Sequence, residues 1–175
     1  SIPFNEWFVF PYCSWFLLLA GVTALLWWYD TASYDKLCLS MFAGMTFCLI
    51  VYMVLPNGLD IRPTAEAVGR SNIAMRIMQL LWSADASVNV CPSIHVFNSL
   101  TLMLAYHRCR LFEEPRRRWM RPAADVLCFS IVCSTMLLKQ HSCIDVVLGA
   151  LLALVLDALF NRAAERSEQP QIWHA

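Results

Sequence analysis

The stretch WFVFPYCSWFLLLAGVTALLWWY, residues 7–29, decides the fold class of this chain, because it holds no charged side chain. A helix of about 17–25 apolar residues crosses the roughly 30 Å hydrocarbon core of a bilayer. Tryptophan and tyrosine lie near both ends of the stretch, where membrane helices place aromatic rings at the water interface. The stretch therefore predicts a transmembrane helix.

The whole chain shares this apolar character. Of its 175 residues, 59% are apolar or aromatic and 15% are charged, and the formal net charge is zero. A soluble domain has about 25% charged and about 45–50% apolar residues, so this chain has too few polar side chains to cover a globular surface in water. The composition excludes a disordered chain and a basic nucleic-acid-binding domain. It predicts a single membrane-embedded domain over residues 1–175.

Four further apolar segments can cross a membrane. They cover residues 37–55, about 92–107, about 122–138 and about 142–160. The alternating pattern of a β-barrel is absent, so we predict an all-α, polytopic transmembrane helical bundle with five spans. Between residues 60 and 86, apolar side chains recur at helical spacing among polar ones. This pattern predicts an amphipathic helix on the membrane interface.

The arginines predict how the chain is oriented. Six of them lie between residues 108 and 121, and two more follow Phe160. By the positive-inside rule these two segments are cytoplasmic, which puts residues 56–91 on the extracytoplasmic side of a membrane that we expect to be the plasma membrane. The same order puts the first residue outside, although the chain has no cleavable signal-peptide pattern. We therefore expect an additional N-terminal transmembrane helix in the full protein.

Ionisable groups gather at the predicted outer ends of the spans, where they cost several kcal/mol unless they are used or paired. His141 and Asp145 are four residues apart and share one helical face if a helix begins by residue 141. A carboxylate can accept the proton of one imidazole nitrogen and thereby raise the nucleophilicity of the other. Taken alone, this spacing is more typical of an ordinary helix start.

A second polar group opens the span that begins near residue 92. His95 follows Pro92 and Ser93, which are typical of the first turn of a helix. Free backbone N–H groups at such a start attract phosphate. Arg62 adds a planar guanidinium that can bind phosphate through two hydrogen bonds. With His141, these residues predict a phosphate-transfer site, and four unrelated interfacial clusters are the alternative.

The order and spacing of these residues resemble the type 2 phosphatidic acid phosphatase (PAP2) superfamily. Its three motifs read KxxxxxxRP, PSGH and SRxxxxxHxxxD. They correspond here to Arg62 with Pro63, to residues 92–95, and to Ser134 followed by His141 and Asp145. The resemblance covers roughly residues 55–150. It implies a six-helix bundle in which the five predicted spans are the second to the sixth, in agreement with the additional helix expected above.

The resemblance also implies a role for each residue. His141 is the nucleophile that forms a phosphohistidine, Asp145 is its partner, and His95 protonates the leaving group. No metal and no cofactor are expected, and the partner is a membrane lipid, a phospholipid or polyprenyl phosphate. We expect the substrate phosphate to contact Arg62, Ser93, Ile94, Ser134 and Lys139.

Three motif positions differ from the family pattern. Leu55 replaces the motif lysine, Ile94 the glycine and Thr135 the arginine, so two expected cations are missing. Lys139 lies one turn beyond Thr135, and we expect it to supply part of the lost charge. An interfacial lysine without this role is the alternative. The Lys-Gln-His sequence at residues 139–141 resembles the branch that contains inositol phosphorylceramide synthase and sphingomyelin synthase.

Three functions follow as hypotheses. The first is a lipid phosphatase of the PAP2 superfamily, the second a transferase that passes a phospho-headgroup to an alcohol, and the third a lipid-binding membrane protein without catalysis. The presence of His95, His141 and Asp145 together favours an enzyme. Cys91 and Cys143 each lie close to one of these histidines, so a disulfide between them or a zinc site is a less favoured interpretation.

Overall fold

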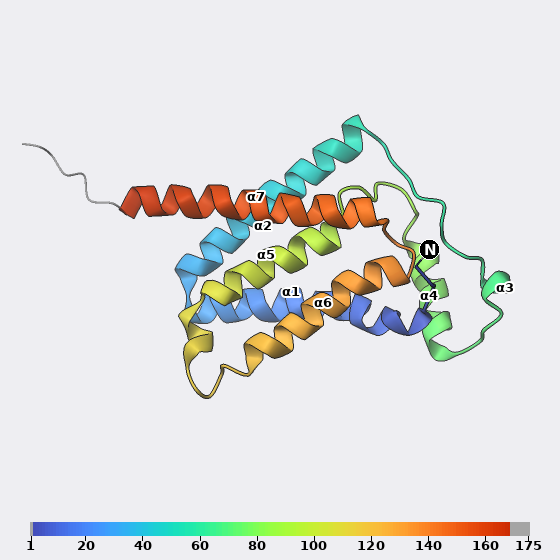
Figure 1. Cartoon of the computed structure of the whole chain (residues 1–175), viewed down its shortest axis with the longest axis horizontal. Helices are drawn as coiled ribbons and strands as arrows, with labels where there is room; N and C mark the ends of the chain where they lie inside the picture. Colours follow the sequence, from blue (N-terminus) through green and yellow to red (C-terminus); the bar gives the residue numbers. More distant parts are fainter. Residues whose placement is uncertain (1, 169–175) are drawn as a thin grey trace, which may run out of the picture.

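The computed structural model describes residues 2–168, with the exception of the side chains of residue 110 and of residues 161–168. Within this part of the chain, the regular structure is helical, apart from one isolated β-bridge between Gly58 and Val88 (Figure 1). The prediction of an all-α fold is therefore confirmed.

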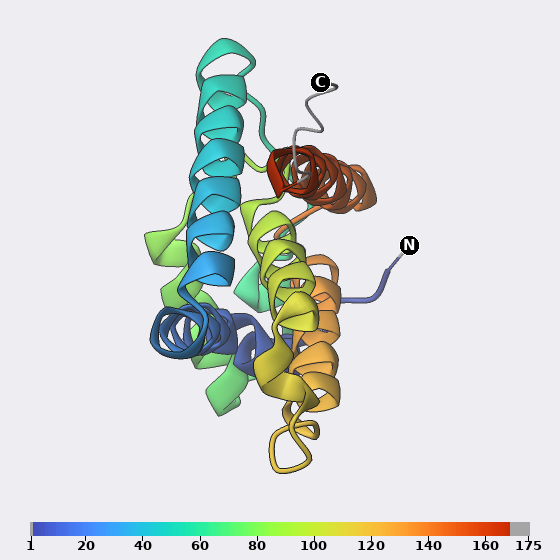
Figure 2. The same ribbon diagram turned by 90° about the vertical axis from the view of Figure 1, so that its left-hand side faces the viewer.

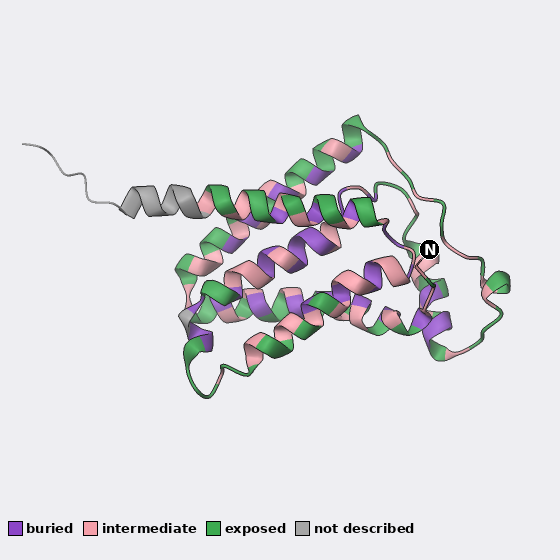
Figure 3. Cartoon of the chain, in the orientation of Figure 1, coloured by how far each residue is buried: buried purple, intermediate pink, exposed green. Residues whose placement is uncertain are grey.

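Among the described residues, four long helices have the length and the composition to cross a membrane. The first runs through η1 (Glu6–Phe8) and α1 (Val9–Tyr29), the second is α2 (Thr31–Val54), the third is α6 (Met120–Leu137), and the fourth is the Cys143–Phe160 part of α7 (Cys143–Glu168). Their buried positions face the inside of the bundle, while many large apolar side chains are exposed on the outside (Figure 3). Such a surface fits an integral membrane protein.

The helix α5 (Ile94–Arg108) corresponds to the third predicted span and lies at the centre of the bundle. It contacts α1, α2, α6 and α7, and Figure 2 shows it between them. A Cβ atom on Gly44 of α2 would lie 2.0 Å from the Phe97 ring, so the missing side chain lets α2 approach α5. The 15 residues of α5 rise about 22 Å, less than the roughly 30 Å hydrocarbon core. The count of five spans therefore stays a prediction.

Caps and breakers explain the ends of the helices. Asp30 Oδ1 accepts a hydrogen bond from the Ser33 N–H at 3.0 Å, which starts α2 at residue 31 instead of 37. The helix α2 ends at Val54 because Leu55 precedes Pro56, and the residue before a proline is disfavoured in a helix.

The segment between α2 and α5 covers one end of the bundle, on the right in Figure 1, and contains α3 (Ala65–Val68) and α4 (Ile73–Ala84). The helix α4 buries Met75 and Met78 against residues of α1 and η1, while Leu80 is exposed. It is thus amphipathic, as predicted, and its place on a membrane interface stays a prediction. At the opposite end, η2 (Arg110–Glu113) and an arginine-rich loop join α5 to α6.

Candidate active site

A cavity of about 200 Å³ lies at the end of the bundle that carries α3 and α4. It is lined by residues from α1, α2, the segment between α2 and α5, the first turn of α5, and the turn between α6 and α7. Four predicted site residues line it together, namely Arg62, Ile94, His95 and His141. The fold therefore brings together residues that are far apart in the sequence.

The two histidines of the cavity lie close to each other, with their ring centroids 6.0 Å apart. His95 belongs to the first turn of α5, which begins where Ser93 Oγ accepts a hydrogen bond from the Val96 N–H at 3.4 Å. Its ring packs against Tyr12 and Trp15 of α1, with 4.6 Å between centroids in each case. Two aromatic rings and a capped helix start thus hold His95 in position.

The hydrogen bond of His141 decides which of its nitrogens can react. Its Nδ1 lies 2.9 Å from the carbonyl oxygen of Val90. A carbonyl only accepts hydrogen bonds, so Nδ1 carries the proton and Nε2 keeps its lone pair. Burial lowers the pKa of His141 below its ordinary value, although the Asp145 carboxylate and the Val90 carbonyl act in the opposite direction. A neutral imidazole with a free lone pair is a competent nucleophile.

Asp145 does not make the direct hydrogen bond to His141 that the four-residue spacing predicted. Its Oδ2 lies 3.9 Å from His141 Nδ1, which is too far for a hydrogen bond. Instead, Oδ2 accepts from the Ser142 N–H at 2.6 Å, while Ser142 Oγ accepts from the Asp145 N–H at 3.4 Å. This reciprocal pair is a capping box that starts α7. Asp145 thus acts on His141 through its charge, and Val90 is the proton acceptor.

Arg62 is held at the wall of the cavity with 14% of its side chain exposed. Its Nη1 donates to the Asp85 carbonyl oxygen at 2.6 Å, and its Nη2 lies 3.3 Å from Asp85 Oδ2 and also donates to Gln140 Oε1. The guanidinium is therefore already paired with a carboxylate. A phosphate that bound Arg62 would compete with Asp85 for it.

Three predicted phosphate contacts do not line the cavity. Ser93 is buried under the start of α7, where its N–H donates to the Asp145 carbonyl oxygen at 3.1 Å. Ser134 Oγ donates to the Ile131 carbonyl oxygen at 2.6 Å, within α6. The Lys139 ammonium group donates to the Ile2 carbonyl oxygen.

Lys139 lies outside the helix on which its predicted position was based. The helix α6 ends at Leu137, and Lys139 has a φ of 57°, so it does not continue the helical face of Thr135. Thr135 itself is buried and donates its hydroxyl hydrogen to the Val132 carbonyl oxygen at 2.7 Å. Neither residue lines the cavity, and a role for Lys139 in replacing the missing charge stays a prediction.

Several contacts of the cavity were not anticipated from the sequence. Asp85 and Gln140 bind Arg62, and Tyr12 and Trp15 pack against His95. Tyr12 and Trp15 are three residues apart and share a helical face, which is a weak signal that a neighbouring element covers them. The Val90 carbonyl carries no signal at all, because a backbone atom is the same for every residue type.

The cysteines of this end are free thiols. Burial, together with the Asp145 carboxylate, raises the pKa of Cys91 to about 11, so its thiol stays protonated at neutral pH. Cys143 is exposed, and its Sγ lies 3.9 Å from Met136 Sδ. Among the described residues, no three or more of histidine, cysteine, aspartate and glutamate form a group that could hold a metal ion.

The arrangement is suited to the transfer of a phosphate group. It combines an imidazole with a defined free nitrogen, a second imidazole beside it, and a guanidinium at the cavity wall. Comparisons with protein-family models, with curated proteins and with solved structures find no match for this chain.

Proposed function

We propose that this chain is an integral membrane enzyme of the PAP2 type, which hydrolyses a lipid phosphate through a phosphohistidine on His141. The observation that carries the proposal is the hydrogen bond from His141 Nδ1 to the Val90 carbonyl. It leaves Nε2 unprotonated in a cavity that His95 and Arg62 also line. The arginine distribution supports an active site on the extracytoplasmic face of the plasma membrane.

The reaction runs in two steps. His141 Nε2 attacks the phosphorus, the bond from phosphorus to the lipid oxygen breaks, and protonated His95 gives its proton to that oxygen. A water molecule then attacks the phosphohistidine, His95 takes a proton from the water, and the bond from nitrogen to phosphorus breaks to release phosphate. Arg62 stabilises the charge on the phosphoryl oxygens in both steps, once the phosphate has displaced Asp85.

A second candidate function is transfer of a phospho-headgroup to an alcohol. The observation that favours it is the charge of the cavity wall, where Arg62 is paired with Asp85. Lys139 contacts Ile2 instead, and the position of the motif lysine holds Leu55. A phosphodiester carries less negative charge than a phosphomonoester, so it requires fewer cations. In this reaction an alcohol replaces water in the second step.

Trapping of the covalent intermediate tests the proposal. Purified protein is incubated with phosphatidate, a polyprenyl phosphate or a phosphodiester lipid, each radiolabelled at phosphorus, and is quenched in denaturant. We expect acid-labile label on the wild-type chain and none on His141→Gln. Release of free phosphate supports hydrolysis, whereas transfer of label to an added alcohol supports the transferase. A wild-type chain that binds these lipids but takes up no label would contradict both and support a lipid-binding protein.

A further inference from the structure

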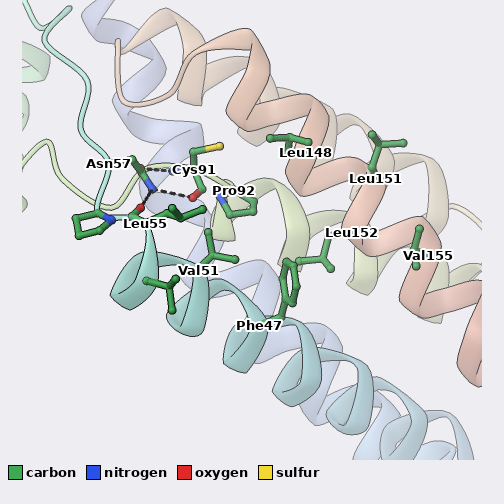
Figure 4. Close-up of a pocket in the computed structure, with 12 residues that line it drawn as sticks. Phe47, Val51, Leu55, Asn57, Cys91, Pro92, Leu148, Leu151, Leu152 and Val155 are labelled. Atoms are coloured by element: carbon green, nitrogen blue, oxygen red, sulfur yellow. Dashed lines mark hydrogen bonds between the residues drawn. The ribbon is translucent and has the colours of Figure 1, made fainter.

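An apolar groove of about 750 Å³ lies between the C-terminal half of α2 and the N-terminal half of α7 (Figure 4). Phe47 and Val51 line it from α2, and Leu148, Leu151 and Val155 line it from α7. The two helices contact each other and diverge toward the end that carries the cavity, so the groove is a wedge (Figure 1). Both helices have the composition of membrane spans. The medium that reaches this wedge in a membrane is therefore hydrocarbon.

The groove and the histidine cavity share one wall, residues 88–92, which we call the strap. Val90 lines the cavity, and the next two residues, Cys91 and Pro92, line the groove. Asn57 holds the strap in place, because its Oδ1 accepts from the N–H groups of Val90 and Cys91 at 2.8 and 2.9 Å and its Nδ2 donates to the Cys91 carbonyl oxygen at 3.1 Å. Tyr52 adds a hydrogen bond from its hydroxyl to the Pro92 carbonyl oxygen at 2.5 Å.

We propose that this groove holds one hydrocarbon chain of the lipid whose phosphate is bound in the cavity. The inference rests on the proposed function, since it names where the apolar part of that substrate lies. Val90 binds His141 and lines the cavity, and its neighbour Cys91 lines the groove, so the cavity and the groove lie on the two sides of the strap. A lipid that lies across the strap places its phosphate on one side and its hydrocarbon chain on the other.

The size and chemistry of the groove suit a lipid chain. Its helical walls run from Phe47 to Val54 and from Leu148 to Val155, or roughly 10 Å of helix each at 1.5 Å per residue. This length is about a third of the hydrocarbon core. Leu55 lines the groove and is exposed, at the position where the family motif has lysine. An apolar side chain there suits contact with hydrocarbon and not with a phosphate.

Photo-cross-linking tests the inference without requiring turnover. The probe is a phosphatidate that carries a diazirine within one acyl chain, added to the purified full chain in lipid nanodiscs, with mass spectrometry to locate the adducts. We expect adducts on residues 47–55 and 148–155 of the wild-type chain. Leu151→Trp fills the groove and is expected to lower those adducts at least fivefold. The matched control is Leu154→Trp, because Leu154 lies on the same helix, is 52% exposed against 50% for Leu151, and does not line the groove.

Substrate chain length provides a second measurement. For Leu151→Trp, we expect kcat/KM to fall about tenfold with dioleoyl phosphatidate and less than twofold with dihexanoyl phosphatidate, while Leu154→Trp changes neither. Adducts spread evenly over the exposed faces, or equal effects of the two variants, would overturn the inference. Adducts confined to the groove of a protein that forms no phosphohistidine would support the chain site and contradict hydrolysis, so the two proposals fail separately.

Discussion

Each end of the helix bundle brings a histidine close to an aspartate, and the two pairs differ in distance and in exposure. At the arginine-rich end, His107 Nε2 lies 2.8 Å from Asp125 Oδ1, and both side chains are well exposed. At the cavity end, His141 Nδ1 lies 3.9 Å from Asp145 Oδ2, and both side chains are nearly buried. The shorter and better-formed contact is thus the one outside the candidate active site.

The difference shows that a short distance between histidine and aspartate does not by itself single out the candidate site. Asp125 occupies Nε2 of His107, and it also accepts a hydrogen bond from the Tyr106 hydroxyl at 2.5 Å. His141 bonds through Nδ1 to a backbone carbonyl, which keeps Nε2 for a substrate. Burial, a second histidine and a cavity distinguish the end that holds the candidate site.

The largest expected effect comes from the same substitution made at both ends. His141→Gln removes the nucleophile, so we expect kcat/KM for a lipid phosphate to fall at least about 10³-fold, as in other enzymes that lose a nucleophile. His107→Gln is expected to change it less than twofold. Equal losses in the two variants, measured by phosphate release from purified protein, would remove the functional distinction between the ends.

Arginine substitutions come next in size. Arg62→Gln removes a donor that stabilises developing charge, and we expect a loss of about 10²-fold in kcat/KM, with partial recovery in Arg62→Lys. Arg108→Gln at the other end breaks an ion pair with Asp157. It is expected to leave kcat/KM within twofold and to lower Tm by about 1–3 °C, because a partly exposed pair contributes about 1 kcal/mol or less. An unchanged rate in Arg62→Gln would contradict the assigned phosphate contact.

A pair of glycine variants tests how closely helix packing controls the site. A Cβ atom on Gly149 of α7 would lie 2.6 Å from the Ser93 carbonyl oxygen, next to the turn that positions His95, whereas one on Gly21 of α1 would meet nothing within 4 Å. Overpacking costs about 1–3 kcal/mol. We expect Gly149→Ala to lower kcat/KM about tenfold and Gly21→Ala to leave it unchanged, with thermal unfolding measured to confirm that both fold. Full activity in Gly149→Ala would contradict the prediction, because it would mean that α7 and the Ser93 backbone move apart without disturbing His95.

The smallest expected effect is in the pH dependence. Burial lowers the pKa of His141 from the ordinary histidine value of about 6.5, so kcat/KM should persist as the pH falls through 6.5 and decline only below it. Between the lowered pKa of His141 in the folded chain and the value of about 6.5 in the unfolded chain, the unfolded chain binds more protons than the folded chain. The contribution of His141 to the free energy of unfolding is therefore fully present above a pH of about 6.5, and it decreases as the pH falls toward the lowered pKa.

Thermal unfolding as a function of pH checks this last prediction. The Tm of the wild-type chain should decrease as the pH falls below about 6.5. We expect this decrease to be smaller in His141→Gln and unchanged in His107→Gln. An acid limb of kcat/KM at or above pH 6.5 would contradict a buried, neutral His141.

The helices could be predicted well because their signals are local. The charge-free stretch that ends at Tyr29 became α1, and the apolar spacing between residues 60 and 86 became α4. The start of α2 was placed too late, because Asp30 caps it and a polar first turn precedes the apolar run. The third predicted span is a helix as expected, but at 15 residues it is shorter than a full membrane crossing.

The candidate site could be predicted only in part, because its polar contacts depend on backbone paths between helices. The motifs pointed to His95, His141 and Arg62, which do line one cavity. They could not show that Asp85 pairs with Arg62, because residue spacing does not predict how the long segment between α2 and α5 folds back on itself. The position of Lys139 differs from the expected one for a related reason, because α6 ends at Leu137 and helical spacing does not apply beyond it.

The strap has a further consequence for the membrane itself. In a membrane the groove would be open to hydrocarbon and the cavity to water, and one short stretch of backbone, tied down by the Asn57 amide, divides the two. With its N–H and carbonyl groups engaged by Asn57, Tyr52 and His141, the strap presents few unpaired dipoles through which ions or water could pass. The backbone segment that orients the His141 ring would thereby also separate water from hydrocarbon.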